Sequence, residues 1–130
     1  MADFTKWEIY MLLNQAKPLW LAGVSLYSAN LRRADLERAI LERAILIESI
    51  LEHANLRGAN LRGAALSDAR LMGADLTEAD LSGALLDNAN LEGAILDKAI
   101  LTGATYSKET TWPQGFNPAG AGAILKLKAD

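Results

Sequence analysis

The chain has 130 residues, a mass of 14.0 kDa and a formal net charge of −3. This length fits one domain. Because the sequence contains no cysteine, it excludes a disulfide framework, a thiol nucleophile and a zinc site with thiolate ligands.

The first residues predict a short helix that caps the structure that follows. Thr5 and Glu8 have the spacing of a capping box, and Pro18 is expected to help end the helix. The residues that would share one face of this helix are Trp7, Tyr10 and Met11. The apolar stretch that begins at Ile9 is interrupted by polar residues, and its flank lacks the basic run of a signal peptide. We therefore expect no membrane span and a cytoplasmic location.

A strict repeat of five residues governs the middle of the chain. Leucine occupies every fifth position from Leu26 to Leu101, sixteen times in succession, and the third residue after each leucine is alanine except at Ser49. On an α-helix, leucines five apart would step around the axis by about 140° each and form no apolar face. On a flat strand they would alternate between the two faces. The repeat therefore predicts a chain that turns a corner every five residues, so that each leucine points inward.

This repeat resembles the pentapeptide-repeat family, whose consensus is A(D/N)LXX. Residues 54–58, 59–63 and 74–78 follow that consensus at every position. The resemblance implies an all-β solenoid, a right-handed quadrilateral β-helix of about four coils with leucine and alanine inside. Each buried leucine should contribute roughly 1.5–3 kcal/mol. We assign residues 1–20 to an N-terminal helical cap, 21–105 to the β-helix, and 106–130 to a C-terminal cap and tail.

Coils of 20 residues would bring outward side chains of opposite charge together on neighbouring coils. The expected pairs are Arg32–Glu52, Glu37–Arg57, Glu42–Arg62 and Glu78–Lys98. Where glycine lies two residues after leucine, we expect a type II turn, which needs a positive φ at that position. Side chains at the same corner of the early coils are expected to avoid positive φ. These corners are Arg33, Arg38, Arg43, Glu48 and His53.

Most aromatic residues and all three prolines lie outside the repeat, where a solenoid needs its ends covered. Residues 111–118, followed by 121–123, resemble a closing segment common in cyanobacterial pentapeptide-repeat proteins, which implies a cyanobacterial source. Trp112 and Phe116 are expected to lie over the last coil. Residues 124–128 either form a short strand or stay mobile.

The residue pattern offers no catalytic constellation, so we expect no enzyme, no catalytic residue, no cofactor and no metal. The single histidine, His53, occupies an outward corner, and Ser49 has no candidate base but can bond to nearby backbone. Asp35, Asn55 and Asp75 would form an outward ladder, which the family's usual Asp or Asn at this position explains without a cation. The arginines of the first coil alternate with acids, so we expect no nucleic acid partner.

Two functions stay open for such a rod. The first is a non-catalytic protein-interaction or regulatory scaffold, expected to be a monomer with an unidentified protein partner and no membrane contact. The second comes from a branch of the family that resembles DNA and protects type II topoisomerases by occupying their DNA-binding surface. DNA mimicry calls for a long acidic rod. Here residues 26–65 carry six arginines and five acids, net +1, whereas residues 66–105 carry two basic residues and seven acids, net −5.

Apolar side chains at outward positions mark the candidate interaction surface. One wall, built around Leu26, Leu46, Leu66 and Leu86, carries Tyr27 and Ile47 in one outward ladder and Ile45, Ala65 and Leu85 in another. The candidate interaction surface is therefore Tyr27, Ile45, Ile47 and Leu85, because apolar patches on a charged surface tend to bind partners. The alternative is that the N-terminal segment or the C-terminal tail folds back over this wall.

Overall fold

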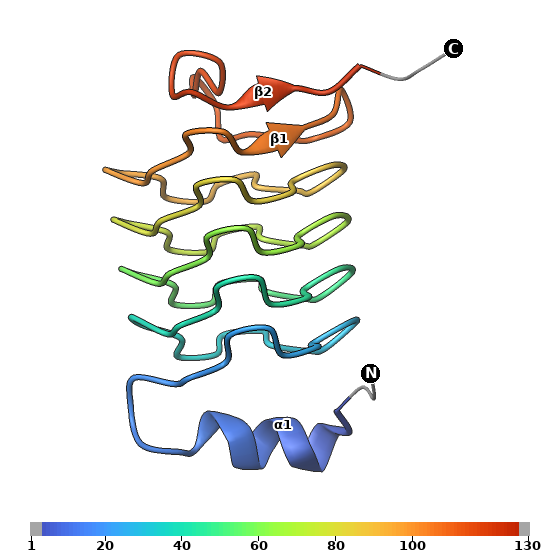
Figure 1. Cartoon of the computed structure of the whole chain (residues 1–130), viewed down its shortest axis with the longest axis vertical. Coiled ribbons are helices and arrows are strands. Elements are labelled where there is room, and N and C mark those ends of the chain that lie inside the picture. Colours follow the sequence, from blue (N-terminus) through green and yellow to red (C-terminus); the bar gives the residue numbers. More distant parts are fainter. Residues whose placement is uncertain (1–3, 128–130) are drawn as a thin grey trace.

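The computed structural model describes residues 4–127. The chain forms a right-handed quadrilateral β-helix with a helix, α1 (Lys6–Leu13), beneath its first coil (Figure 1). Two short strands, β1 (Thr105–Tyr106) and β2 (Ile124–Leu125), lie at the other end of the rod. Lys128, at the end of the tail considered above, lies outside the described residues.

Stacked coils pair residue with residue at a spacing of 20. Parallel bridges run from Trp20↔Ile40 to Leu85↔Thr105 without a change of register. The Leu56 N–H donates to the Asp75 carbonyl of the next coil at 2.8 Å, and this contact recurs at leucine after leucine in the coils below the last. The expected 20-residue coil is therefore confirmed, and its backbone polar groups are satisfied by the coils above and below.

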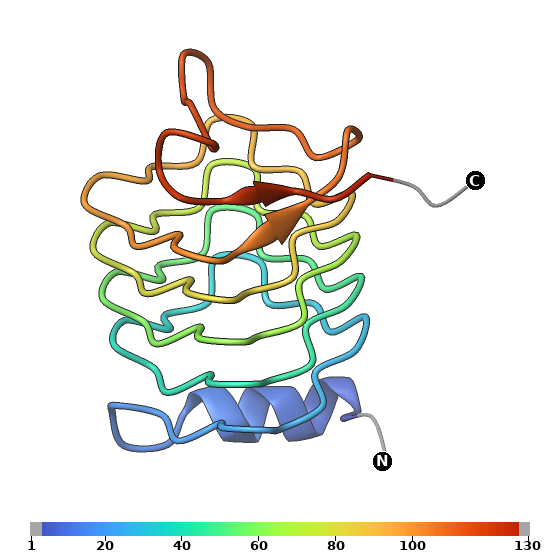
Figure 2. The same ribbon diagram turned by 45° about the horizontal axis from the view of Figure 1, so that its top comes forward.

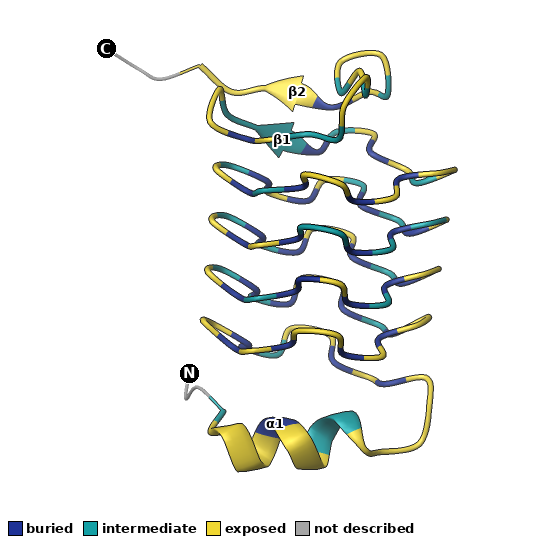
Figure 3. Ribbon diagram, turned by 180° about the vertical axis from the view of Figure 1, so that it is seen from behind, coloured by how far each residue is buried: buried dark blue, intermediate teal, exposed yellow. Residues whose placement is uncertain are grey.

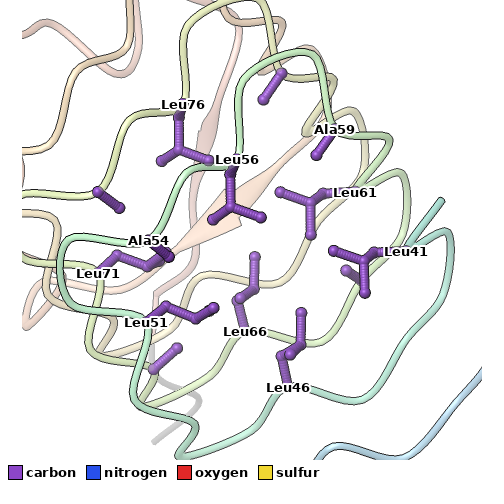
Figure 4. Packing of buried hydrophobic residues seen from close by; sticks show 14 of the residues in the cluster. Leu41, Leu46, Leu51, Ala54, Leu56, Ala59, Leu61, Leu66, Leu71 and Leu76 are labelled. Atoms are coloured by element: carbon purple, nitrogen blue, oxygen red, sulfur yellow. The ribbon is translucent and has the colours of Figure 1, made fainter. Parts of the chain in front are cut away.

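The leucines fill the interior of the rod. All of those from Leu36 to Leu91 are fully buried. Figure 4 shows Leu46, Leu51 and Leu56, from three successive walls of one coil, pointing into the core. The small alanines let the coil wall close around them. Ser49, the one exception among the alanines, is also buried, and its Oγ donates to the Leu46 carbonyl at 2.7 Å, so its hydroxyl group is satisfied.

All corners use the same turn, and our expectation for the early coils is wrong. The Ala34 N–H donates to the Leu31 carbonyl at 3.0 Å, and Arg33 between them has φ 59°, close to the 64° of Gly58. A positive φ at the third residue of such a turn is the mark of type II. The same conformation occurs at the other early corners that were expected to avoid positive φ, namely Arg38, Arg43, Glu48 and His53.

The physical reason lies in the next coil. The N–H of Arg33 donates to the Glu52 carbonyl and the N–H of Gly58 donates to the Thr77 carbonyl, both at 2.9 Å. Another turn at Arg33 would break this bond and rotate the following strand away from the core. The left-handed conformation costs a residue with a side chain about 1–2 kcal/mol. The coil accepts this cost because another turn would take the strand after Arg33 out of register with the next coil.

The 20-residue register places all four expected charge pairs on adjacent coils, but only two form ion pairs. Arg32 Nη1 lies 3.6 Å from Glu52 Oε1, and Arg62 Nε lies 4.0 Å from Glu42 Oε1. Arg57 instead turns upward to Asp75. Within the described residues, Glu37–Arg57 and Glu78–Lys98 make no contact short enough for an ion pair.

The N-terminal helix covers the first coil with its aliphatic face, and its aromatic side chains point away from the coil. Its capping box is confirmed, since Thr5 N–H donates to Glu8 Oε1 at 2.9 Å and Glu8 N–H to Thr5 Oγ1 at 3.2 Å. Ile9 is buried against the core, and the residues half-buried beside it are Leu12 and Leu13. Trp7 is 68% exposed and stacks on Tyr10. Figure 3 shows that most of α1 faces solvent.

The C-terminal segment closes the other end by packing and by strand pairing. Trp112 and Phe116 pack against the core, as expected, with their ring centroids 5.3 Å apart. The tail forms the short strand β2, which pairs in parallel with β1 at Thr105↔Ile124. Figure 2 shows β2 lying along one wall above β1. The wall around Leu86 is thus extended by one further strand.

Candidate interaction surface

Three of the four walls carry ladders of charged side chains. On the wall around Leu51, Glu52 forms ion pairs with two arginines, with Arg32 Nη1 at 3.6 Å and Arg70 Nη2 at 2.8 Å. The Glu52 side chain is only 11% exposed, so the two guanidinium groups compensate a carboxylate that its neighbours have largely covered. This wall presents paired charges to solvent.

The other two charged walls carry the same motif one repeat apart. Arg57 Nη1 lies 3.1 Å from Asp75 Oδ2, and Arg62 Nη1 lies 3.1 Å from Asp80 Oδ2. The second oxygen of each aspartate accepts from a hydroxyl two residues on, Thr77 at 2.5 Å and Ser82 at 2.6 Å. These contacts tie arginines of one coil to aspartates of the next.

This motif lowers the pKa of both aspartates. Burial by itself would raise the pKa of Asp75, but hydrogen bonds from Thr77 and Arg57 outweigh it and hold the pKa below its ordinary value of 3.8. Asp80 has its pKa lowered against burial in the same way, by Ser82 and Arg62. Hydrogen bonding and charge pairing with Asp75 raise the pKa of Arg57. Both carboxylates are therefore ionised at neutral pH, and their ion pairs with Arg57 and Arg62 help to hold neighbouring coils together.

The fourth wall, built around Leu26, Leu46, Leu66 and Leu86, differs and is called the apolar wall below. Its own outward residues, in 25–28, 45–48, 65–68 and 85–88, include no arginine or lysine. The structure brings all four candidate residues onto it. Tyr27 is 41% and Leu85 42% exposed, whereas Ile45 and Ile47 are half-buried between their neighbours. These four residues form the apolar strip.

Neither terminus, as far as it is described, hides the strip. Helix α1 lies beneath the first coil rather than along the wall (Figures 1 and 2). Strand β2 stacks above Thr105, and Lys126 Nζ reaches down to Asp87 Oδ2 at 3.1 Å. The hydroxyl of Tyr27 donates to Glu48 Oε2 at 3.0 Å, which holds the aromatic ring at the edge of the wall.

Two exposed outward isoleucines were left out of the candidate surface. Ile95 and Ile100 belong to the last coil, on the two walls that bear the Asp75 and Asp80 motifs, and both are exposed. Their signal in the sequence is the same as that of Ile45, an apolar side chain directly before leucine. What the sequence did not reveal is the incomplete cover above them.

The side chains weighed for chemistry have structural contacts. His53 lies over Gly73, so that a Cβ at residue 73 would come within 2.6 Å of the imidazole ring. Asn55 Nδ2 donates to Asp35 Oδ1 at 3.4 Å. Across residues 4–127, no three His, Asp or Glu side chains come together in a way that could hold a metal ion. No helix in the same range is long and apolar enough to cross a membrane.

Comparison with known proteins places this architecture in a family. The family model of pentapeptide repeats matches residues 25–63, 39–77 and 74–105. A search of curated proteins gives no match. A pentapeptide repeat protein from Nostoc Pcc 7120 is 40% identical, with a TM-score of 0.60 over 95% of this chain and 97% of that one.

Two further solved structures are similar over a smaller share of the chain. One is a pentapeptide repeat protein from the cyanobacterium Cyanothece 51142, 41% identical with a TM-score of 0.55, over 76% of this chain and 67% of that one. The other, from the thylakoid lumen of Arabidopsis thaliana, is 35% identical with a TM-score of 0.57, over 68% of this chain and 65% of that one. With its repeats matched by the family model and its length matched at 40% identity, this chain belongs to the pentapeptide repeat family.

Proposed function

We propose that this protein is a non-catalytic interaction scaffold that docks a protein partner on the apolar strip. The observation that supports this is the contrast between walls. Three walls pair their arginines with acids along the rod, whereas the apolar wall leaves Tyr27 and Leu85 more than a third exposed. When a partner covers such exposed apolar groups and removes them from water, the free energy of the complex is lowered.

The residues at the border of the strip indicate the chemistry of the partner. The corner beside it carries Glu48 and Asp68, both exposed. A partner that fits this wall therefore presents apolar side chains flanked by lysine or arginine. Charge complementarity of this kind steers association and fixes orientation more than it adds affinity.

The test is a double substitution, Ile45→Lys with Leu85→Lys, in a tagged protein used for affinity capture from the source cell. We expect capture of the partner to fall at least about tenfold, which corresponds to roughly 1.4 kcal/mol, while the melting temperature stays nearly unchanged. The matched control is Asn60→Lys with Asn90→Lys, which adds the same charge at equivalent ladder positions on two other walls. The control should capture normally.

Three results would contradict the proposal. Unaltered capture by the double variant would place the partner elsewhere, and loss of its fold would make the strip structural. Protection or inhibition in a gyrase supercoiling assay would favour the DNA-mimic alternative, since the scaffold has no effect there. A cytoplasmic location is part of the same proposal and is checked by fractionation of the source cell.

A further inference from the structure

The C-terminal segment pairs fully with the last coil on only two of the four walls. On the wall around Leu101 it makes one bond, from the Gly103 N–H to the Gly122 carbonyl at 3.0 Å. Above Leu91, Thr111 both accepts from the Leu91 N–H at 2.7 Å and donates to the Ala89 carbonyl at 2.9 Å. Above the apolar wall, Ile124 donates to the Ala104 carbonyl and Lys126 to the Tyr106 carbonyl, both at 2.7 Å. These two walls therefore end in a paired strand.

The remaining edge, residues 94–101, is called the open edge. One coil lower, the equivalent N–H groups all donate upward, for example Leu76 to Ile95 at 2.8 Å and Glu78 to Asp97 at 2.9 Å. In the last coil the corresponding groups have no hydrogen-bond partner among the described residues. They are the N–H groups of Leu96, Lys98 and Leu101 and the carbonyls of Ala94 and Ala99.

A groove adjoins this edge. A cavity of about 500 Å³ is bounded by Ala94–Asp97 on one side and by the loop Pro113–Phe116 on the other. Its volume is within the range of sites that bind ligands. Ile95 beside it is 44% exposed, and Ile100 further along the edge is also exposed. Unpaired backbone groups, apolar side chains and open space thus occur together at one place.

We propose that the open edge binds an extended peptide segment of a partner protein as one additional strand. The peptide backbone would accept from Leu96 and Lys98 N–H and donate to the Ala94 carbonyl, as the next coil would. Addition of a strand to a sheet edge takes affinity from main-chain hydrogen bonds and selectivity from alternate side chains. A side chain above Leu96 would face inward beside Phe116, which also lines the groove, so the peptide carries an aliphatic residue there.

Charge selects a basic side chain at the following position of the peptide. That position lies directly above Asp97, in the same 20-residue relation in which Arg57 lies above Glu37 three coils lower. Glu92 and Asp97 are both exposed against the single Lys98 nearby. The preferred segment therefore reads small residue, polar residue, leucine, then arginine or lysine.

The open edge is on different walls from the apolar strip, so this proposal does not depend on the proposed function. The probe is a synthetic peptide with the sequence of residues 54–61, ANLRGANL, which occupies the same two walls two coils lower. Titration into the 15N-labelled full chain should give saturable amide shifts at Leu96, Lys98 and Leu101 and in the loop 113–116. Hydrogen exchange of these three amides should slow in the complex.

Two substitutions at equivalent ladder positions make the test specific. Ile95→Lys should weaken peptide binding at least about fivefold, whereas Leu85→Lys, at a residue of similar exposure on the apolar wall, should leave binding unchanged. Asp97→Lys should also weaken binding of this arginine-bearing peptide, and it alters only an exposed side chain.

Several outcomes would overturn the proposal. They are the absence of saturable shifts, shifts centred on the apolar strip or on α1, and equal binding by Ile95→Lys and Leu85→Lys. Concentration-dependent shifts at the open edge in the free protein would also overturn it, because the occupant would then be a second copy of the chain.

Discussion

The lower coils, residues 26–65, and the upper coils, residues 66–105, share one backbone but reach it with different residues. In the lower coils six of the eight corners bear a side chain, whereas in the upper coils glycine alternates with other residues. The corner φ nevertheless stays between 55° and 73° throughout. The comparison teaches that hydrogen bonds between coils impose the turn, and that the local residue only changes how much strain the turn contains.

Charge divides the two regions as well. The lower coils are close to neutral and the upper coils are acidic, yet the two join through Arg57–Asp75 and Arg62–Asp80. The boundary between them is therefore held by opposite charges in addition to the leucine core. Four experiments break or sharpen this comparison.

The largest effect is expected from removal of residues 106–130. The upper coils would lose Trp112, Phe116 and β2 from their end. The leucines of the last coil and an unpaired strand edge would then be exposed, which favours end-to-end association. Light scattering should give a 14.0 kDa monomer for the full chain and larger species for the truncated one. A full-length dimer joined through its C-terminal end would contradict this.

A smaller loss is expected from Gly73→Ala. Gly73 has φ 69°, and an added Cβ would lie 2.6 Å from the His53 ring of the coil below. We expect a cost of about 2–3 kcal/mol in urea unfolding, from left-handed backbone and steric overlap together. The control, Gly83→Ala, has φ 67° and no atom within 4 Å, and should cost about 1–2 kcal/mol.

A double-mutant cycle separates the two contributions. In a His53→Ala background the overlap is gone, so Gly73→Ala should cost no more than Gly83→Ala. An unchanged cost in that background would mean that backbone strain alone accounts for the loss.

A modest gain in stability is expected when a strained corner becomes glycine. Arg33 and Lys98, one in each region, have φ 59°, and their side chains make no hydrogen bond or ion pair among the described residues. Relief of about 1–2 kcal/mol of backbone strain, less the roughly 0.5–1 kcal/mol of extra chain entropy of glycine, leaves a small net gain for each. Urea midpoints should rise equally for Arg33→Gly and Lys98→Gly; a fall at Arg33 alone would show that the lower corners are not strained.

The smallest effect concerns pH. The pKa values of Asp75 and Asp80 are lowered in the folded chain. Their contribution to the free energy of unfolding is therefore complete at pH values above the ordinary pKa of 3.8 and is lost as the pH falls below it. The urea midpoint should therefore drop between about pH 5 and pH 2. The Asp75→Asn, Asp80→Asn double variant should start lower at pH 5 and show a smaller drop. An equal drop in both proteins would assign the acid sensitivity to other carboxylates.

Much of the fold could be predicted because the repeat turns every leucine inward and because its resemblance to the pentapeptide-repeat family implies a right-handed coil with four sides. Leucine every fifth residue placed the core, and opposite charges 20 apart placed neighbouring coils. The candidate strip followed from the same register, since Ile45 and Leu85 must share a wall once the coil length is known. The corner at Arg33 was mispredicted because local preference was given more weight than the hydrogen bond to the next coil.

The sequence by itself determined the periodic part of this protein: its coil length, its inward leucines and the wall on which the apolar side chains gather. The tertiary structure alone decided the features without a period. These are the turn at the side-chain-bearing corners, the outward direction of Trp7 on α1, and the open edge at residues 94–101. Each depends on contacts between segments far apart in the chain or at its two ends, where no repeated neighbour fixes the geometry.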